Sequence, residues 1–166
     1  MSLIAVPFRI GPEDKDSAIL NGLLGLPIFP LPEDEALRTF RLAQVLTDPR
    51  NVVWETWHDG RIVGVLLLTD IKPKLDAQAH FAFFDRRLVG RQALIKNVMT
   101  KAFADLELER LSIEIPEHLS ALIRFAEKKL GFKPEGKRHH AFWDAESGWR
   151  DVVCLRVLRS EFDATS

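Results

Sequence analysis

The sequence contains no tyrosine, a single cysteine and almost no net charge. Because Cys154 is alone, it excludes a disulfide within the chain and a metal cluster of several cysteines, and it suits a reducing compartment. Lys and Arg number 23 against 24 Asp and Glu, so the net charge of -1 gives no general attraction to nucleic acid or to acidic membranes. Any site for an anion must therefore be local.

Long apolar runs are also missing. None reaches the ~20 residues of a membrane span, and the start, MSLIAVPFRIGPED, lacks the basic flank and apolar core of a signal peptide. We therefore expect a soluble cytoplasmic protein. Its 166 residues, 46% of them hydrophobic, fit one globular domain over residues 1–166.

Hydrophobic periodicity and turn residues predict the order of the secondary-structure elements. Strands are expected at 3–10, at two runs within 52–70 joined by the hairpin turn Asp59-Gly60, at 77–85, at 110–116, and in the two last segments KPEGKRHHAFWD and RDVVCLRVLR. Helices are expected at 13–24, 33–46, 91–105 and 118–130. This order predicts an α/β fold, with a mixed sheet and helices on its faces.

The segment FFDRRLVGRQALIKNV, residues 83 to 98, predicts an anion site. A strand ends there and a helix begins at once, so unpaired backbone N–H groups and the positive end of a helix dipole converge. Gly90 permits a close approach of the backbone, while Arg86, Arg87 and Arg91 can donate charge-assisted hydrogen bonds to phosphate oxygens. A solvated arginine cluster at the edge of a sheet is the alternative. The sequence contains neither GxxxxGK[ST] nor GxGxxG, so a P-loop or a Rossmann nucleotide site is not supported.

Over roughly residues 3 to 160, this element order, the arginine-rich turn and EKKLGFKPEG at 127–136 resemble the GNAT superfamily of acyl-CoA-dependent N-acetyltransferases. The most similar branch is the one that modifies the N-termini of ribosomal proteins. The resemblance implies a sheet whose fourth and fifth strands splay apart, so that the pantetheine chain of acetyl-CoA fits between them and bonds to the backbone of 80–84.

The resemblance also implies where the cofactor binds. The family's Arg/Gln-x-x-Gly-x-Gly/Ala loop, which holds the pyrophosphate, corresponds to the stretch from Arg87 to Arg91, but Gln92 stands where a small residue is expected and Ala93 comes one position late. The implied cofactor-binding residues are Phe83, Phe84, Arg87, Leu88, Val89, Gly90, Arg91, Gln92, Ala93 and Ser120. No metal is expected.

The implied reaction is direct attack of an amine on the thioester, with a backbone N–H steadying the oxyanion. Two protons must move, and many family members use a tyrosine as the acid. Glu127 stands at that tyrosine's position, and Ser120 at that of an asparagine that contacts the cofactor. Acid help would come from Glu127, Ser120 or Cys154, or be unnecessary.

Two further residues are candidates for the base. Glu114 shares a strand face with Ser112, opposite Leu111 and Ile113, and could emerge beside the splayed strands. The alternative for Glu114 is an exposed or salt-bridged strand residue. His80 titrates in a suitable range, but a lone histidine in a buried strand is more often a hydrogen-bonded core residue.

The remaining chemistry-bearing residues have blander alternatives. Adjacent strand residues His139 and His140 point to opposite faces and should not chelate one ion. The basic run over 128–138 could touch RNA, but acids interspersed with it favour a solvated face. Trp143 and Trp149 could shape the acceptor pocket or pack in a core or dimer, and the loop 25–32 is a candidate specificity element. Cys154 is expected in the core.

The sequence thus predicts an N-acetyltransferase that uses acetyl-CoA and an amine acceptor, either a protein N-terminus or a small amine, as a possible homodimer without nucleic-acid or membrane partners. The alternative is a catalytically inactive acyl-CoA-binding or protein-interaction module with the same fold. An RNA-binding module is the third reading.

Overall fold

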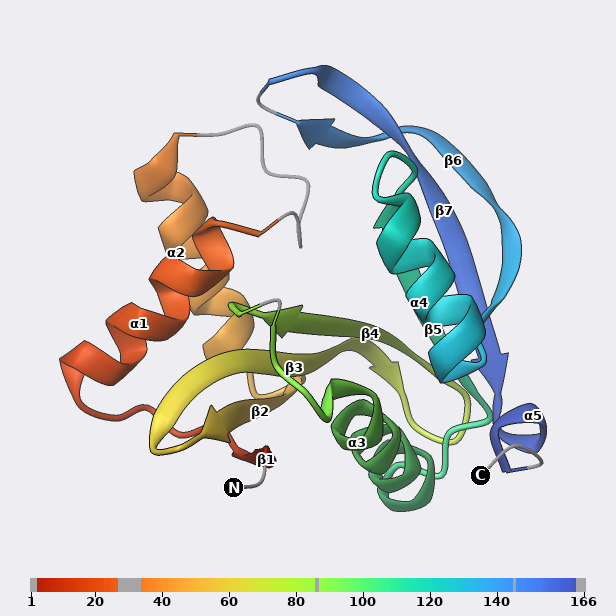
Figure 1. Ribbon diagram of the computed structural model, residues 1–166, viewed down its shortest axis with the longest axis horizontal. Helices are drawn as coiled ribbons and strands as arrows, with labels where there is room; N and C mark the ends of the chain where they lie inside the picture. The colour runs from red at the N-terminus through yellow and green to blue at the C-terminus, as the bar shows by residue number, and fades with distance from the viewer. Residues whose placement is uncertain (1–2, 27–33, 86, 145, 164–166) are drawn as a thin grey trace.

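The computed structural model describes residues 3–26, 34–85, 87–144 and 146–163. Within them, one seven-stranded sheet has the order β1-β2-β3-β4-β5-β7-β6 and is accompanied by five helices (Figure 1). The strands are β1 Ile4–Pro7, β2 Val52–His58, β3 Arg61–Lys72, β4 Asp76–Phe83, β5 Arg110–Pro116, β6 Lys133–Asp144 and β7 Gly148–Leu158. The helices are α1 Glu13–Leu24, α2 Glu35–Thr47, α3 Arg91–Asp105, α4 Ser120–Leu130 and α5 Arg159–Asp163. The predicted mixed α/β architecture is confirmed.

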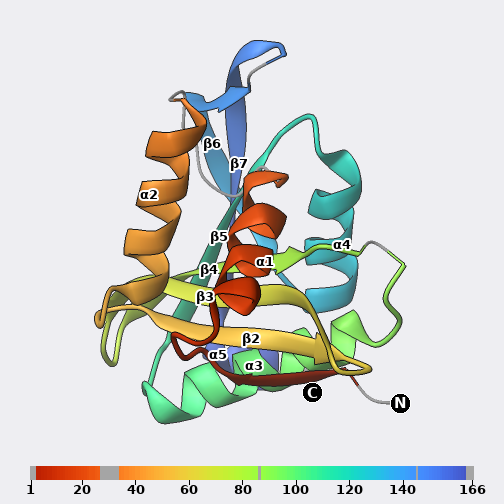
Figure 2. The same cartoon turned by 90° about the vertical axis from the view of Figure 1, so that its left-hand side faces the viewer.

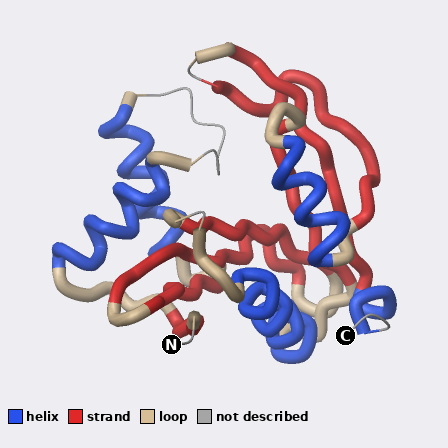
Figure 3. The backbone as a smooth tube through the Cα atoms, in the orientation of Figure 1, coloured by secondary structure: helices blue, strands red, loops and turns tan. Residues whose placement is uncertain are grey.

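The sheet is antiparallel except at its centre, where β4 and β5 run parallel. Their pairing covers only Asp76–Gln78 against Arg110–Ser112. Beyond these residues the two strands diverge, and Figure 3 shows the sheet opening into two wings, β1 to β4 on one side and β5, β7 and β6 on the other. The predicted splay between the fourth and fifth strands is present.

Helices cover both faces of the first wing because its strands alternate between two cores. Val65 and Leu67 of β3 pack with Leu23 of α1 and Leu42 of α2, whereas Leu66 and Leu68 belong to the core that α3 and α4 cover. Figure 2 shows α1 and α2 on one side of the sheet and α3 on the other. The face of each β4 residue therefore decides which helices it meets.

Local signals fixed several element ends. Asp59 and Gly60 both have positive φ, 51° and 74°, as a tight hairpin between β2 and β3 requires. The side chain of Asp34 caps α2 by accepting a hydrogen bond of 2.9 Å from the N–H of Leu37.

Three expectations need correction, and one helix was not predicted. The first strand ends at Pro7 rather than at residue 10, and the Arg9 N–H donates to the side chain of Glu55 at 3.2 Å instead of to a strand. The helix expected at 118–130 begins at Ser120, and α5 was not foreseen. Cys154 is only half-buried, on the face of β7 opposite Leu155, so its placement in the core was wrong. Most of the loop 25–32 lies outside the described residues.

No helix in the described part of the chain is both long enough and apolar enough to cross a membrane.

Candidate active site

The gap between β4 and β5 exposes strand backbone in the middle of the sheet. On its other edge β4 pairs with β3 as far as Phe83, opposite Gly64, but toward β5 its pairing stops at Gln78. Backbone N–H and C=O groups beyond Gln78 that point toward β5 have no strand partner there. An extended ligand could bond to them as a further strand would.

The amino terminus of α3 follows directly at the end of β4. Gly90 is its N-cap with φ 88°, and the first intrahelical bond runs from Leu94 N–H to Gly90 C=O over 3.0 Å. The N–H groups of Arg91, Gln92 and Ala93 precede that bond and have no acceptor within the helix. Together with the dipole of a 15-residue helix they form a site that favours an anion.

Two of the predicted arginines can be placed beside this helix end, and Arg86 lies outside the described residues. The Arg91 guanidinium lies 5.9 Å from the ring centroid of Phe83 and is half-buried, whereas Arg87 is exposed. Asp85 Oδ1 accepts a 2.8 Å hydrogen bond from Arg87 N–H, which shapes the turn. The exposed Arg87 can turn toward an anion without breaking an internal contact.

Gln92 does not fill the cradle despite its size. Its Nε2 donates to the backbone oxygen of Lys129 at 3.1 Å, so the side chain reaches across to the end of α4. The helix amide groups, the left-handed Gly90 and Arg87 therefore fit a diphosphate group, as acetyl-CoA carries. Leu88 and Val89 complete the turn, with Val89 88% exposed.

Ser120 and Glu127 lie on one face of α4, since seven residues make almost two full turns. Ser120 is the exposed first residue of the helix, and Glu127 is half-buried. These positions do not test the predicted roles, which are cofactor contact for Ser120 and proton donation for Glu127.

Glu114 lies on β5 with its side chain on the face opposite Ile113, as predicted. Its Oε1 accepts a 2.7 Å hydrogen bond from Arg138 Nη1 of β6 in an ion pair, which raises the pKa of Arg138. The salt-bridged alternative is thus present. Because 30% of the Glu114 side chain is exposed, the carboxylate still meets solvent.

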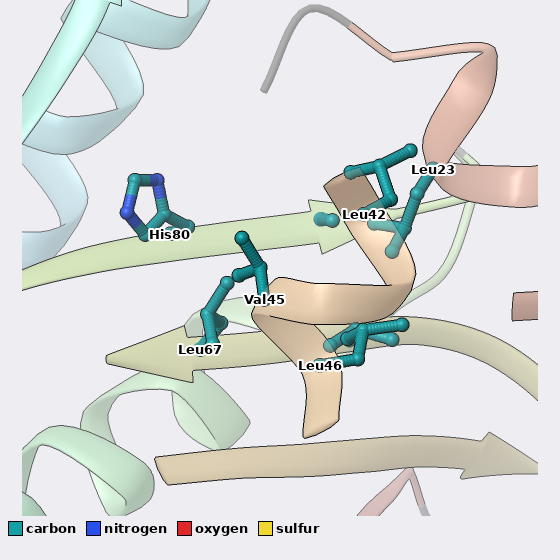
Figure 4. Close-up of a pocket in the computed structure, with 8 residues that line it drawn as sticks. Leu23, Leu42, Val45, Leu46, Leu67 and His80 are labelled. Atoms are coloured by element: carbon teal, nitrogen blue, oxygen red, sulfur yellow. The ribbon is translucent and has the colours of Figure 1, made fainter. Parts of the chain in front are cut away.

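His80 is on β4, and its ring borders a pocket between the sheet and the α1–α2 pair (Figure 4). Its Nε2 lies 3.0 Å from Thr69 Oγ1 of β3, and burial lowers the pKa of His80 to about 4. The side-chain hydrogen bond between His80 and Thr69 was not predicted from the sequence. It would have needed the β3–β4 register, in which Leu67 faces His80 and Thr69 is the next residue on that face.

Trp143 and Trp149 form an edge-to-face pair at the end of the β6–β7 hairpin, with centroids 5.4 Å apart and planes at 76°. Trp149 remains 53% exposed, so this pair does not belong to a core. Asp144 organises the hairpin end by accepting from the N–H groups of Glu146 and Ser147 at 2.8 and 3.0 Å. An acceptor or a second protein chain could contact the exposed indole.

The other singled-out residues have structural partners. His139 Nδ1 lies 2.8 Å from Asp151 Oδ2, and no cluster of three potential metal ligands exists in the described part of the chain. In the basic run, Lys133 pairs with Glu161 at 2.7 Å and Lys137 with Glu117 at 2.5 Å, which favours the solvated-face reading over RNA binding. Burial raises the pKa of the Cys154 thiol.

Similarity to known proteins is found at the level of structure. No family model matches the sequence, and no curated protein is significantly similar to it. The spermidine N-acetyltransferase from Vibrio cholerae in complex with CoA and spermine superposes with a TM-score of 0.78 and 15% identity, over 96% of this chain and 97% of that one. A mutant of that enzyme superposes with a TM-score of 0.78 and 15% identity, over 99% of this chain and 98% of that one. A dodecameric structure of the enzyme superposes with a TM-score of 0.75 and 15% identity, over 99% of this chain and 98% of that one. The chain therefore has the fold of these GNAT N-acetyltransferases.

Proposed function

We propose that this protein transfers the acetyl group of acetyl-CoA to a primary amine. The observation that supports this most strongly is the gap between β4 and β5, which opens beside the amino terminus of α3. An exposed strand backbone and an anion cradle, placed end to end, suit a ligand with an extended amide-containing arm and a diphosphate. The solved structures with this fold include one in complex with CoA and spermine.

The residues that would hold acetyl-CoA follow from this arrangement. The backbone from His80 in β4 to Phe84 just after it would bond the pantetheine arm, the stretch Arg87 to Ala93 would hold the diphosphate, and Ser120 would contact the cofactor from α4. Acetyl-CoA supplies an acyl group activated as a thioester. A β4 backbone N–H in the gap can donate a hydrogen bond to the developing oxyanion.

For proton transfer we propose Glu114 and Glu127. Glu114 lies on β5 beside the gap, where a carboxylate can attract the ammonium form of an acceptor and take its proton directly or through water. The ion pair with Arg138 holds this carboxylate in place. Glu127 occupies the family's acid position on α4 and could act as an acid only in its protonated form.

The acceptor is a protein N-terminus or a small amine. The resemblance of EKKLGFKPEG to the ribosomal-protein branch supports the first, and the spermidine and spermine acetyltransferases of similar fold support the second. The exposed Trp149 at the hairpin end can contact either one. We place the protein in the cytoplasm, which a lone cysteine suits, and we expect homo-oligomers because a structure of similar fold is dodecameric.

A non-catalytic acyl-CoA-binding or interaction module is the second candidate. It is favoured by the absence of tyrosine from the sequence and by the ion pair that engages Glu114. An acetyltransferase and a non-catalytic acyl-CoA-binding module both bind coenzyme A, whereas a pure interaction module does not. Binding and turnover must therefore be measured separately.

The test is calorimetry and thermal unfolding with coenzyme A, followed by a free-thiol assay with acetyl-CoA over a panel of amines and N-terminal peptides. At 100 times its dissociation constant a ligand stabilises by about 2.7 kcal/mol. Binding with thiol release that depends on an amine is the expected result. Binding without release would leave the inactive module, and no binding would overturn the proposal.

A further inference from the structure

His80 lies on β4, which forms one edge, or lip, of the gap; β5 forms the other lip. The His80 side chain is on the face of the sheet that α1 and α2 cover. The β4 strand pairs with β5 as far as Gln78, and His80 is the next β4 residue on the same face. Its partner on β3 is Leu67, which belongs to the α1–α2 core. Figure 4 shows the imidazole standing off β4 on the side where Leu23 and Leu42 lie.

The surroundings of this ring are aliphatic. The pocket that His80 borders is otherwise lined from α1, α2, β3 and β4 by leucine, valine and alanine side chains, such as Leu23, Leu42 and Ala82. Among the described residues that line it, His80 is the one that can gain or lose a proton. The lining of this pocket therefore offers one side chain for proton transfer.

We propose that His80 relays the proton of the acetyl transfer, a role that rests on the proposed function. As the nitrogen of a neutral amine bonds to the acyl carbon and the carbon–sulfur bond breaks, the nitrogen must lose a proton and the sulfur must gain one. A ring nitrogen of His80 accepts the first proton and returns a proton to the sulfur. The products are an amide and a thiol, and the ring ends as it began.

Thr69 is the positioning residue for this relay. The 3.0 Å separation between Thr69 Oγ1 and His80 Nε2 is a hydrogen bond. When Nε2–H donates to the hydroxyl, the imidazole carries its lone pair on Nδ1, which is the form that accepts a proton. The hydrogen bond to the hydroxyl thereby fixes the ring orientation, and the relay requires that the hydroxyl accept from Nε2–H.

The partial burial of His80 supports a role in passing a proton on rather than in keeping it. Because burial lowers the pKa of His80 to about 4, the ring is neutral at pH 7 and accepts a proton only transiently. Once protonated, it holds the proton weakly and passes it on readily to a thiolate, whose thiol has an ordinary pKa near ~8.5. In this relay His80, rather than Glu127, supplies the acid in a sequence that has no tyrosine.

The experiment compares the wild type with H80Q, T69V and the control H58Q, a histidine substitution on β2 away from the gap. Glutamine can keep a hydrogen bond to Thr69 but cannot relay a proton. We expect kcat to fall about 100-fold in H80Q and several-fold in T69V, with coenzyme A affinity by calorimetry unchanged in both and kcat unchanged in H58Q. Added imidazole should restore part of the activity of H80A.

A second readout does not depend on turnover. In protein with ¹⁵N-labelled histidine, the ring signals absent from H80Q belong to His80. At pH 7 they should show a neutral ring with its proton on Nε2, a preference that T69V should weaken. A ring that is protonated at pH 7, or neutral with its proton on Nδ1, would overturn the proposal.

The two proposals fail differently. A wild type that binds coenzyme A but acetylates no amine removes the proposed function and the relay with it. An active wild type with an equally active H80Q removes the relay alone. If H80Q does not fold, T69V decides, because a kcat equal to that of the wild type would contradict the need for an oriented ring.

Discussion

His80 and Glu114 lie on the same face of the sheet, each two residues beyond Gln78 and Ser112, the last pair that joins β4 to β5. One ionisable side chain therefore stands at equivalent places on each lip of the gap. Thr69 holds His80 and Arg138 holds Glu114. Two proton transfers accompany amide formation from an ammonium, and this arrangement offers Glu114 for the first and His80 for the second.

Replacing Gly90 by alanine should weaken coenzyme A binding and the fold together. A side chain at φ 88° is strained by about 1 kcal/mol, although its Cβ would meet no atom within 4 Å. We expect a lower free energy of unfolding and a lower affinity in calorimetry, because the strained turn displaces the α3 amide groups. Gly136 is the matched control, since it has neither a positive φ nor a close neighbour. Equal coenzyme affinity in G90A and G136A would contradict the cradle.

The substitution R87A should affect binding alone. Arg87 is exposed, so its removal should change the free energy of unfolding by less than about 0.5 kcal/mol. Loss of one charge-assisted contact to the diphosphate should lower coenzyme A affinity about tenfold, which corresponds to about 1.4 kcal/mol. The control K101A removes a lysine at the far end of α3, paired with Asp105 at 2.5 Å, and should leave affinity unchanged. An R87A protein with wild-type affinity would remove the arginine from the site.

The substitution E114Q separates a catalytic from a structural carboxylate. If Glu114 prepares the acceptor, kcat should fall about tenfold or more with coenzyme A affinity retained. The lost ion pair with Arg138 is partly exposed and should change stability by less than about 1 kcal/mol. E117Q breaks the similar Glu117–Lys137 pair and is the control. A kcat reduced equally in both variants, or in neither, would return Glu114 to a purely structural role.

The residues that could be predicted from the sequence are those whose role is local. Asp59-Gly60 predicted a turn because positive φ is a property of the dipeptide, and Gly90 marked the start of α3 for a similar reason. The first strand was predicted to continue to residue 10, but it ends at Pro7. Even so, Phe8 N–H continues the contact by donating to Val53 C=O over 2.9 Å.

The contacts that define the site depend on register and could not be read from spacing. Glu114 of β5 and Arg138 of β6 are brought together because both strands pair with β7. Gln92 reaches Lys129 because α3 and α4 cover the same face of the sheet. The choice between a catalytic and a salt-bridged Glu114 therefore stayed open in the sequence. The gap itself was expected from the family resemblance, not from any local pattern.

The stability of the protein should fall as the pH decreases from about 6.5 to about 4, through His80. Its pKa is lowered on folding from 6.5 to about 4, so the unfolded chain binds a proton that the folded chain refuses over this window. The stability is complete above pH 6.5 and declines by at most about 1.4 kcal/mol per pH unit for one such group.

Urea unfolding at several pH values measures this effect, with H80Q as the variant that removes it. Carboxylates with lowered pKa, such as Asp151, lose their contribution only at more acidic pH, as they become protonated below the usual range of an aspartate. H80Q should therefore show a flatter profile between pH 6.5 and 4 and rejoin the wild-type slope below it. Parallel profiles throughout would mean that His80 is protonated as easily in the folded chain as in the unfolded one, which would contradict the neutral ring on which the relay depends.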